Sequence, residues 1–595
     1  MESSKRLVDV IGELEEDIIY GRVEITQYSD NSVSFKCAGN YRVDWGDGCV
    51  QEFDGRTTAS HIYLPLRAGE DSKEIIFKIT PKNKRCKITS IDFSPNKNHH
   101  SIMCCKCTEL LFNTPYLRKL IFNKINRLNN AMSVKRITIK KHALKEMNYL
   151  FYKLDKLESI DELDTSNIID MEGMFASCRN LVEIPVLNTS NVLNMSCMFN
   201  NCAKLTTIPL LDTSNVIRMD HMFNGCIKLS NVPLLDTSNV LRMDHMFQAC
   251  VNLTTIPLLD TSKVKNMNCM FIGCTNLIEI PLLDTKSVIE MTYMFGGCEN
   301  LTTIPLLNTS NVTDMHSMFE GCTNLIKIPL LDTSKVSNTG YMFYECKNLT
   351  EVPLLSTSNV IHMGSMFRGC TNLKTIPLLD TKEVASMSNM FDGCTEFIEL
   401  PPLNTSNVLH MDSMLSNTKI QTIPLLDTSK VVNMHYLFNG CSNLIKIPLI
   451  NTSNAINMHH MFTYCIKLKD IPQLDTGKAI HMSQMFYNCM RLVEIPLLDT
   501  SSAINMHHMF THCTSLVRIP QLNTGNVRNM SGMFYGCTSL SEIPQLDTSH
   551  VIDMTSMFYN CKSLTKIPKF NTRNVKHASY MFTGCDNLPN LVLER

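Results

Sequence analysis

The sequence has almost no net charge and no long apolar run. Its 55 Lys and Arg residues nearly cancel its 56 Asp and Glu residues, which leaves a formal charge of −1. This balance excludes the broad basic surface with which proteins bind nucleic acid or anionic membranes. No apolar stretch approaches the roughly 18 residues of a membrane span, so we expect no membrane insertion. The N-terminal MESSKRLVDVIGELEED lacks the apolar segment of a secretory signal, which predicts a cytoplasmic, viral or host-intracellular location.

The sequence also lacks the motifs of common catalytic sites. It contains no glycine-rich phosphate loop, no GxSxG nucleophile turn and no HExxH metal motif. We therefore predict that the protein is not an enzyme, and we assign no cofactor and no catalytic, cofactor-binding or metal-ligating residue. The hydrophobic fraction of 44% is that of a folded protein, which excludes extensive disorder.

What the sequence does contain is an internal repeat marked by cysteine. Seventeen of the 25 cysteines fall in one column with a step of 24 residues, interrupted once. The column consists of Cys178, Cys202, Cys226, Cys250, Cys274, Cys298, Cys322, Cys346, Cys370, Cys394, Cys441, Cys465, Cys489, Cys513, Cys537, Cys561 and Cys585. The interruption, from Cys394 to Cys441, is one residue short of two steps, which predicts a deletion where a cysteine should stand. A fixed period of about 20 to 50 residues is typical of a solenoid, propeller or similar array.

Residues 163–593 contain 18 units, numbered here from 1 to 24 as in LDTSNVIRMDHMFNGCIKLSNVPL at residues 211–234. Position 3 is Thr in every unit, position 23 is Pro in all but the last, and positions 12 and 13 are Met and Phe except at Leu437 and Leu415. Apolar residues stand at positions 1, 6, 9, 12, 13, 16, 19, 22 and 24. This spacing near three fits neither a helix nor a strand. It predicts a coil whose short segments point these side chains inward.

The unit suggests three local structures. We place a short parallel strand at positions 19 to 24, which read LxxIPL. Proline cannot donate a ladder hydrogen bond, so the strand either ends at position 22 or turns its proline nitrogens away from the ladder. A second short strand is expected at positions 6 to 9, and a helical or 3₁₀ turn at 12 to 16. Asp, Asn or Ser at position 2 favours turn capping by a side-chain oxygen over calcium binding, because the charge is dispensable there.

The chain is predicted to have three regions. Residues 163–595 form a solenoid of 18 repeats of 24 residues, which must stack because one unit buries too little to offset its ordering entropy. Residues 101–162 form an N-terminal cap of degenerate repeats, in which Leu144, Phe151 and similar residues keep the inward spacing. Residues 1–100 contain alternating β runs and a tight turn at Trp45-Gly46-Asp47-Gly48, and predict a small β-sandwich.

The repeated MFxxCxxLxxIPLLDTSNVxxM resembles the unit of BspA-like bacterial surface proteins, a leucine-rich-repeat variant, over most of the 595 residues. The front region, with VDWGDG at 43–48, His61-Ile62-Tyr63 and IIFKI at 75–79, resembles a polycystic-kidney-disease (PKD)-type immunoglobulin-like domain. These resemblances imply a β-rich, α/β-like leucine-rich-repeat solenoid with short parallel strands and helical or 3₁₀ turns, preceded by a β-sandwich at residues 1–100. They also imply adhesion or recognition at a cell surface, without catalysis.

Several residue groups admit a second chemical interpretation. The cysteine column could form a disulfide ladder, but an inward column favours reduced core thiols. The Met columns at positions 9 and 12 favour core packing over soft-metal binding. The segment HHSIMCCKC holds zinc-ligand types, but its spacing favours linker or cap residues. Its ligand-type residues are His99, His100, Cys104, Cys105 and Cys107. His221 and His245 share position 11 and are expected on a solvated face.

The favoured function is a non-catalytic scaffold that binds a protein or glycan partner through a repeated face. Positions 20 and 21, with mixed residues such as Thr206-Thr207, are the expected contact face, and their residues name no ligand. The alternative is a structural component that polymerises end to end through an uncapped C-terminal β-edge. An ice- or mineral-binding Thr face is a weaker third hypothesis, since Thr pairs recur in only a few units.

Overall fold

The computed structural model describes residues 5–27, 31–94, 107–122 and 132–589. The chain divides into two compact units, Met1–Val288 and Ile289–Arg595. The first unit contains the named helix and strands together with the first repeats, and the second is built of repeats.

The N-terminal strands form two sheets. A seven-stranded sheet has the order β11-β10-β8-β1-β6-β3-β4, and a four-stranded sheet has the order β5-β2-β7-β9. The elements are α1 (Leu7–Ile11), β1 (Ile18–Ile25), β2 (Ser32–Cys37), β3 (Tyr41–Asp44), β4 (Val50–Phe53), β5 (Ala59–Ile62), β6 (Lys73–Pro81), β7 (Ser90–Asp92), β8 (Cys107–Asn113), β9 (Lys119–Ile121), β10 (Arg136–Lys141) and β11 (Ser159–Leu163). In the described part of the chain α1 is the single helix, so the α/β-like character expected from the repeats is wrong.

An aromatic cluster packs where the two sheets meet. Phe35 of β2 stacks on Phe77 of β6 with ring centroids 6.0 Å apart, and Trp45 lies 5.8 Å from Phe35. Trp45 is buried and donates its indole N–H to Gln51 Oε1 at 2.9 Å, while its carbonyl accepts from the Tyr63 hydroxyl at 3.0 Å. The tight turn predicted after Asp44 lies between β3 and β4, as expected from its glycines.

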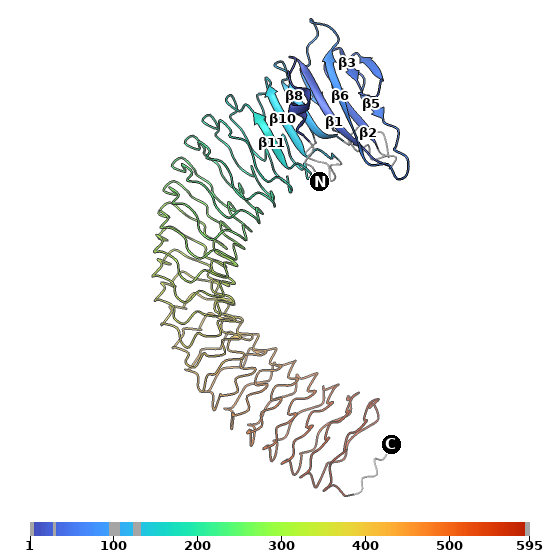
Figure 1. Ribbon diagram of the computed structural model, residues 1–595. Coiled ribbons are helices and arrows are strands. Elements are labelled where there is room, and N and C mark those ends of the chain that lie inside the picture. Colours follow the sequence, from blue (N-terminus) through green and yellow to red (C-terminus); the bar gives the residue numbers. More distant parts are fainter. Residues whose placement is uncertain (1–4, 28–30, 95–106, 123–131, 590–595) are drawn as a thin grey trace. The chain divides into compact units, whose positions relative to one another are not determined.

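The larger sheet continues into the repeats. β8 pairs antiparallel with β1 and parallel with β10, and β10 pairs parallel with β11; Figure 1 shows β8, β10 and β11 side by side. Strands before and after residue 100 therefore share one sheet. The inward residues predicted for the degenerate repeats, including Leu144, Phe151 and Leu157, are buried.

Each 24-residue unit forms one turn of a coil, called a rung below. Within a rung, N–H groups bond carbonyls three residues back, as Cys202 does to Phe199 at 3.0 Å. Between rungs, the N–H groups of positions 9, 11, 13 and 15 bond the next rung, as Phe199 does to Met222 at 2.9 Å. These bonds make positions 9 to 16 a chain of tight turns rather than a helix.

The parallel ladder runs through position 8 rather than positions 19 to 24. Isolated parallel bridges join position 8 of successive rungs, as between Asn194 and Arg218. The predicted strand at LxxIPL is wrong: its described residues make one such bridge, Glu542 to Lys566, and otherwise mainly a single bond at position 20, such as Thr350 N to Ile326 O at 3.2 Å. Proline at position 23 has no N–H to donate, and the segment stays extended without a ladder.

The inward columns form files of like side chains, interrupted at the short rung by Leu415 and Thr418. Successive Phe rings stack, with centroids 5.7 Å apart between Phe199 and Phe223. The Met columns are buried, as at Met219 and Met222, which confirms their predicted packing role. The cysteine column is buried except for the half-buried Cys585, and its thiols donate to backbone carbonyls of the preceding rung, as Cys226 does to Phe199 O at 3.1 Å. The predicted buried thiols are thereby confirmed.

Two details of the repeat differ from prediction. Position 24, expected inside, lies outside, as the exposed Leu210 and Leu234 show. In the short rung, the cysteine is replaced rather than deleted: Thr418 lies 3.4 Å from Cys441 Sγ and donates to Leu415 O at 2.8 Å. Ile420 follows it into the core at the place that Leu takes in other rungs. The missing residue therefore falls between Thr418 and Ile420, where it costs no core contact.

No helix in the described ranges combines the length and the apolar character needed to cross a bilayer.

Candidate partner-binding site

Position 24 carries a column of exposed leucines. In the first compact unit, Met1–Val288, Leu210 is 69% exposed, whereas the adjacent Leu211 is 2% exposed. Proline at position 23 holds the backbone extended, and successive side chains of an extended chain point to opposite sides. Positions 24 and 1 therefore divide between solvent and core. Soluble proteins rarely expose large contiguous apolar patches, and such patches mark interaction sites.

The leucine column lines a groove in the first unit, called the leucine groove below. It has a volume of about 940 Å³ and is formed by positions 24, 1, 2 and 3, with some residues of position 4. Its exposed leucines are Leu210, Leu234, Leu258 and Leu282. No aromatic side chain is among its lining residues.

A row of carboxylates flanks these leucines. The row consists of Asp212, Asp236, Asp260 and Asp284 at position 2. Asp212 Oδ1 accepts from the Ser214 hydroxyl at 2.7 Å and from the Ser214 N–H at 3.1 Å, and these bonds lower the pKa of the Asp212 carboxyl. One carboxylate oxygen thus caps the turn, as predicted, and the other remains for a partner. Lys263 and Lys286 follow Asp260 and Asp284 in the sequence but do not line the groove, so its lining is acidic.

Threonines at position 3 join neighbouring rungs of the leucine groove through hydrogen bonds. Thr237 donates its hydroxyl to the carbonyl of Asp260 in the next rung at 2.8 Å, and Thr261 does the same to Asp284. Both side chains are buried. The bond ties the capping residue of these rungs to the neighbouring rung, whereas the buried hydroxyls of Thr189 and Thr213 in the same groove have no such partner.

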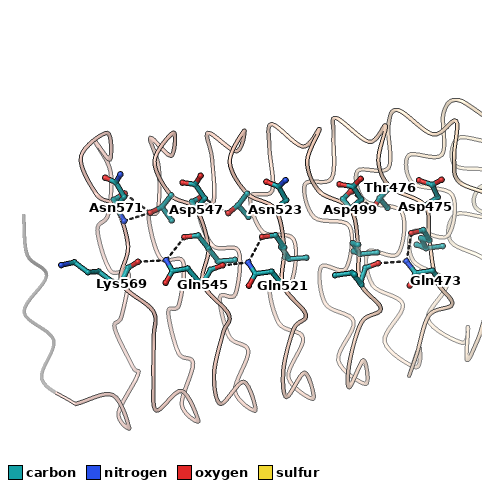
Figure 2. Close-up of a pocket in the computed structure, with 17 residues that line it drawn as sticks. Gln473, Asp475, Thr476, Asp499, Gln521, Asn523, Gln545, Asp547, Lys569 and Asn571 are labelled. Atoms are coloured by element: carbon teal, nitrogen blue, oxygen red, sulfur yellow. Dashed lines mark hydrogen bonds between the residues drawn. The ribbon is translucent and has the colours of Figure 1, made fainter.

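The second unit has a related groove of about 1090 Å³ with a different lining. Gln473, Gln521 and Gln545 replace leucine at position 24, and each donates its amide across to the next rung (Figure 2). The Gln521 amide reaches Gln545 O at 2.5 Å and Leu522 O at 3.2 Å. The same backbone therefore presents leucine at position 24 of some rungs and amides at others, and in the second unit Leu425, Leu449 and Leu497 stay exposed there.

Other sequence predictions have mixed outcomes. Positions 20 and 21, such as Thr206 and Thr207, are exposed as expected. His221 and His245 are half-buried rather than solvated, because their rings stack on each other. In HHSIMCCKC, His99, His100, Cys104 and Cys105 lie outside the described residues, and Cys107 is a buried residue of β8. The terminal β-edge falls partly on residues 590–595, also outside the described ranges. The leucine groove was missed because position 24 looks like core in the sequence.

Comparison with known proteins places the repeats in a family. The model described as "Mycoplasma protein of unknown function, DUF285" matches overlapping segments that together span most of the chain. The segments are residues 121–231, 145–255, 205–303, 242–355, 350–421, 417–518 and 493–593. No curated protein matches the chain.

Solved structures similar to the chain include bacterial leucine-rich-repeat proteins. A leucine-rich-repeat protein of T. pallidum is 19% identical, with 36% of this chain aligned to 84% of that one at a TM-score of 0.23. A leucine-rich-repeat protein of Eubacterium ventriosum ATCC 27560 is 14% identical, with 73% of this chain aligned to 85% of that one at a TM-score of 0.24. On the strength of the family match over its repeats, the chain belongs to the DUF285 family of Mycoplasma-type repeat proteins.

Proposed function

We propose that the protein is a non-catalytic recognition scaffold whose leucine groove binds a protein segment with apolar and basic side chains. The exposed leucine column beside a row of carboxylates is the observation that carries the proposal. Fully burying one leucine contributes about 1.5 to 3 kcal/mol, so several leucines in one groove can support specific binding. The carboxylates add charge complementarity, which gives orientation and a faster encounter more than affinity.

The lining favours protein over glycan as the partner. A glycan has both apolar and polar parts, and aromatic rings are the side chains that suit such an amphipathic ligand. The leucine groove contains no aromatic ring. Leucine and carboxylate side chains instead complement aliphatic and cationic side chains. We propose further that this contact is made at a cell surface, as the resemblance to BspA-like proteins implies.

We also propose that residues 1–100 form the PKD-type immunoglobulin-like sandwich implied by their resemblance. The Phe35–Phe77 contact between β2 and β6 supports two sheets packed face to face. Strand β8 continues the larger sheet toward the repeats, so this sandwich would be joined to the repeats through shared hydrogen bonds rather than a linker.

The binding proposal can be tested with substitutions that the chain itself contains. Leu234→Gln and Leu258→Gln copy Gln473 and Gln521 at the same repeat position, and Asp236→Asn copies the Asn that caps other rungs, so these changes keep the fold. The matched control is Leu241→Gln, because Leu241 is exposed at position 7, outside the groove. The probes are synthetic 12-residue peptides that combine Leu with Lys, Leu with Glu, or Ser with Lys.

The Leu–Lys peptide is expected to bind the full chain more tightly than either other peptide. The Leu234→Gln and Leu258→Gln double variant should weaken this binding at least about tenfold, which corresponds to about 1.4 kcal/mol. Asp236→Asn should reduce the preference for Lys over Glu, and Leu241→Gln should change neither. Equal binding of all three peptides, or equal loss in the Leu241→Gln control, would contradict the proposal.

A further inference from the structure

A stacked pair of histidines lies in the first unit, away from the leucine groove. His221 and His245 occupy position 11 of consecutive rungs, with ring centroids 4.3 Å apart and ring planes 6° apart. His221 Nδ1 lies 3.2 Å from Asn224 Nδ2, and His245 Nδ1 lies 2.8 Å from Gln248 Oε1. These contacts engage the Nδ1 atom of each ring and leave each Nε2 for another ligand.

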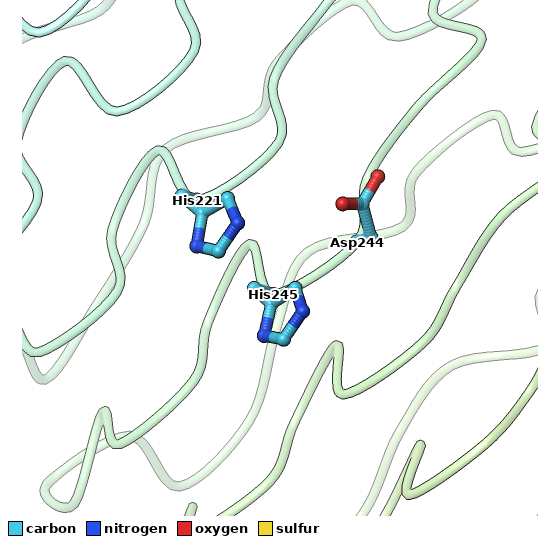
Figure 3. Close-up of side chains that lie close together, drawn as sticks. All are labelled: His221, Asp244 and His245. Atoms are coloured by element: carbon cyan, nitrogen blue, oxygen red, sulfur yellow. The ribbon is translucent and has the colours of Figure 1, made fainter.

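A buried carboxylate completes the group. One ligand atom from each of His221, Asp244 and His245 lies within 4.8 Å of the others, and in the described part of the chain this is the one group of three such residues gathered so closely. Figure 3 shows a ring nitrogen of each histidine on the side of Asp244. Since the Nδ1 atoms meet Asn224 and Gln248 instead, the nitrogens facing Asp244 are Nε2.

Asp244 is already held by an arginine. Arg242 donates Nε to one carboxylate oxygen and a terminal nitrogen to the other, both at 3.0 Å. An ionised carboxylate has about four acceptor positions, so this pairing orients Asp244 and leaves positions for a cation. The partly exposed guanidinium can also move away from the cation, because Arg242 lies at the surface.

The neighbouring rungs continue the run of metal-binding residue types. Position 11 is Cys197 in the rung before His221 and Cys269 in the rung after His245, so four consecutive rungs carry Cys, His, His and Cys at one position. Asp244 is near enough to Cys269 to help raise the pKa of its thiol, after burial. Two imidazoles and a carboxylate, near thiols, are ligands that suit Zn²⁺ among the divalent cations.

We propose that His221, Asp244 and His245 form a Zn²⁺ site, with water in the fourth position. Parallel rings have parallel lone pairs, so binding requires at least one ring to turn out of the stack, and their half-exposed setting permits this. The bound cation would join two consecutive rungs.

The test measures Zn²⁺ binding to the full chain by competition with a chromogenic indicator. His221→Ser and His245→Ser place at position 11 the residue found at Ser317 and Ser365, so the fold should be kept; circular dichroism checks this. The matched control is His460→Ser, which removes a position-11 histidine that stacks on Tyr436 instead of on a second histidine with a nearby carboxylate. Because other cysteines can bind zinc, the readout is the difference from the unmodified chain.

Each histidine variant is expected to bind one equivalent of Zn²⁺ less than the unmodified chain, and the His460→Ser control the same number. Asp244→Asn, which copies Asn268 at position 10, should weaken that equivalent at least about tenfold, since even outer-shell partners are worth about 10- to 100-fold in metal affinity. Unchanged stoichiometry in both histidine variants, or an equal loss in the control, would overturn the site.

Cobalt substitution tests the ligand set. With Co²⁺, the difference spectrum between the unmodified chain and His221→Ser should contain ligand-field bands without thiolate charge transfer. A thiolate band in that difference would place Cys197 or Cys269 on the metal and overturn the assignment of Asp244 as the third ligand.

Discussion

Two neighbouring leucines should differ greatly in their contribution to stability. Leu235, at position 1, is 2% exposed, and Leu234, at position 24, is 65% exposed. Leu235→Ala removes a core side chain and leaves a cavity, which costs about 2 to 5 kcal/mol. Leu234→Ala removes a side chain that already faces water, and surface changes of this kind stay within about 0.5 kcal/mol. The sequence pattern alone assigns both leucines to the core.

The assay is urea unfolding of the full chain, followed by the fluorescence of its single tryptophan. Trp45 is buried in the first unit, which also contains both leucines. A long repeat array need not unfold in one step, so a signal from this unit is preferable to a global one. With a slope of about 1 to 3 kcal/mol/M for small proteins, Leu235→Ala should lower the midpoint of this transition by on the order of 1 M.

The control is Leu241→Ala, because Leu241 is exposed but lies outside the leucine groove. It should behave like Leu234→Ala. If Leu234→Ala lowers the midpoint as much as Leu235→Ala does, position 24 belongs to the core. The groove, and the binding proposal built on it, would then be lost.

Four further predictions follow from the rungs. Phe223→Ala should destabilise the first unit by about 3 to 5 kcal/mol. Phe223→Leu, which copies Leu415, should destabilise it by about 1.5 kcal/mol or less. The tryptophan unfolding transition measures both changes. Burial raises the pKa of Cys226 to about 12, so a thiol reagent at pH 8 should label it only after unfolding, as followed by mass spectrometry. Asp236→Asn should leave the midpoint unchanged, because the amide oxygen still caps the turn. Burial, and then neighbouring histidines, lower the pKa of His459 and His460 to about 4. Unfolded histidine titrates near 6.5, so as the pH drops the unfolded state gains protons before the folded state does. The unfolding free energy of the second unit should therefore fall between about pH 6.5 and pH 4, and it should fall less steeply in a variant with serine at both positions.

The core columns were predictable because one chain repeats them many times. Phe at position 13, Met at positions 9 and 12 and Cys at position 16 vary so little among units that their inward placement follows from spacing alone. The capping role of Asp212 and its equivalents was predictable for a similar reason: Asn and Ser replace Asp, so an oxygen matters there more than a charge. Burial and hydrogen bonds bear out both inferences.

Other features depend on information that the pattern does not carry. Leu234 and Leu235 are both leucine, and only the extended backbone after proline decides which of them faces water. The ladder at position 8 lies within the second strand expected at positions 6 to 9, but the main strand was placed at LxxIPL because that segment is apolar, whereas polar residues such as Asn194 and Arg218 occupy position 8. The approach of Asp244 to two histidine rings follows from stacking of rungs, which brings together residues 24 apart in sequence.

The central claim is that successive turns stack and seal their methionines inside. Oxidation of the native full chain by hydrogen peroxide, mapped by peptide mass spectrometry, tests this most directly, because three methionines lie close together in sequence. Met482 and Met485 are fully buried at positions 9 and 12, and Met490 is 42% exposed. We predict that Met490 is oxidised rapidly while Met482 and Met485 stay protected until the chain unfolds. Oxidation of all three at one rate in the folded protein would contradict the stacked coil.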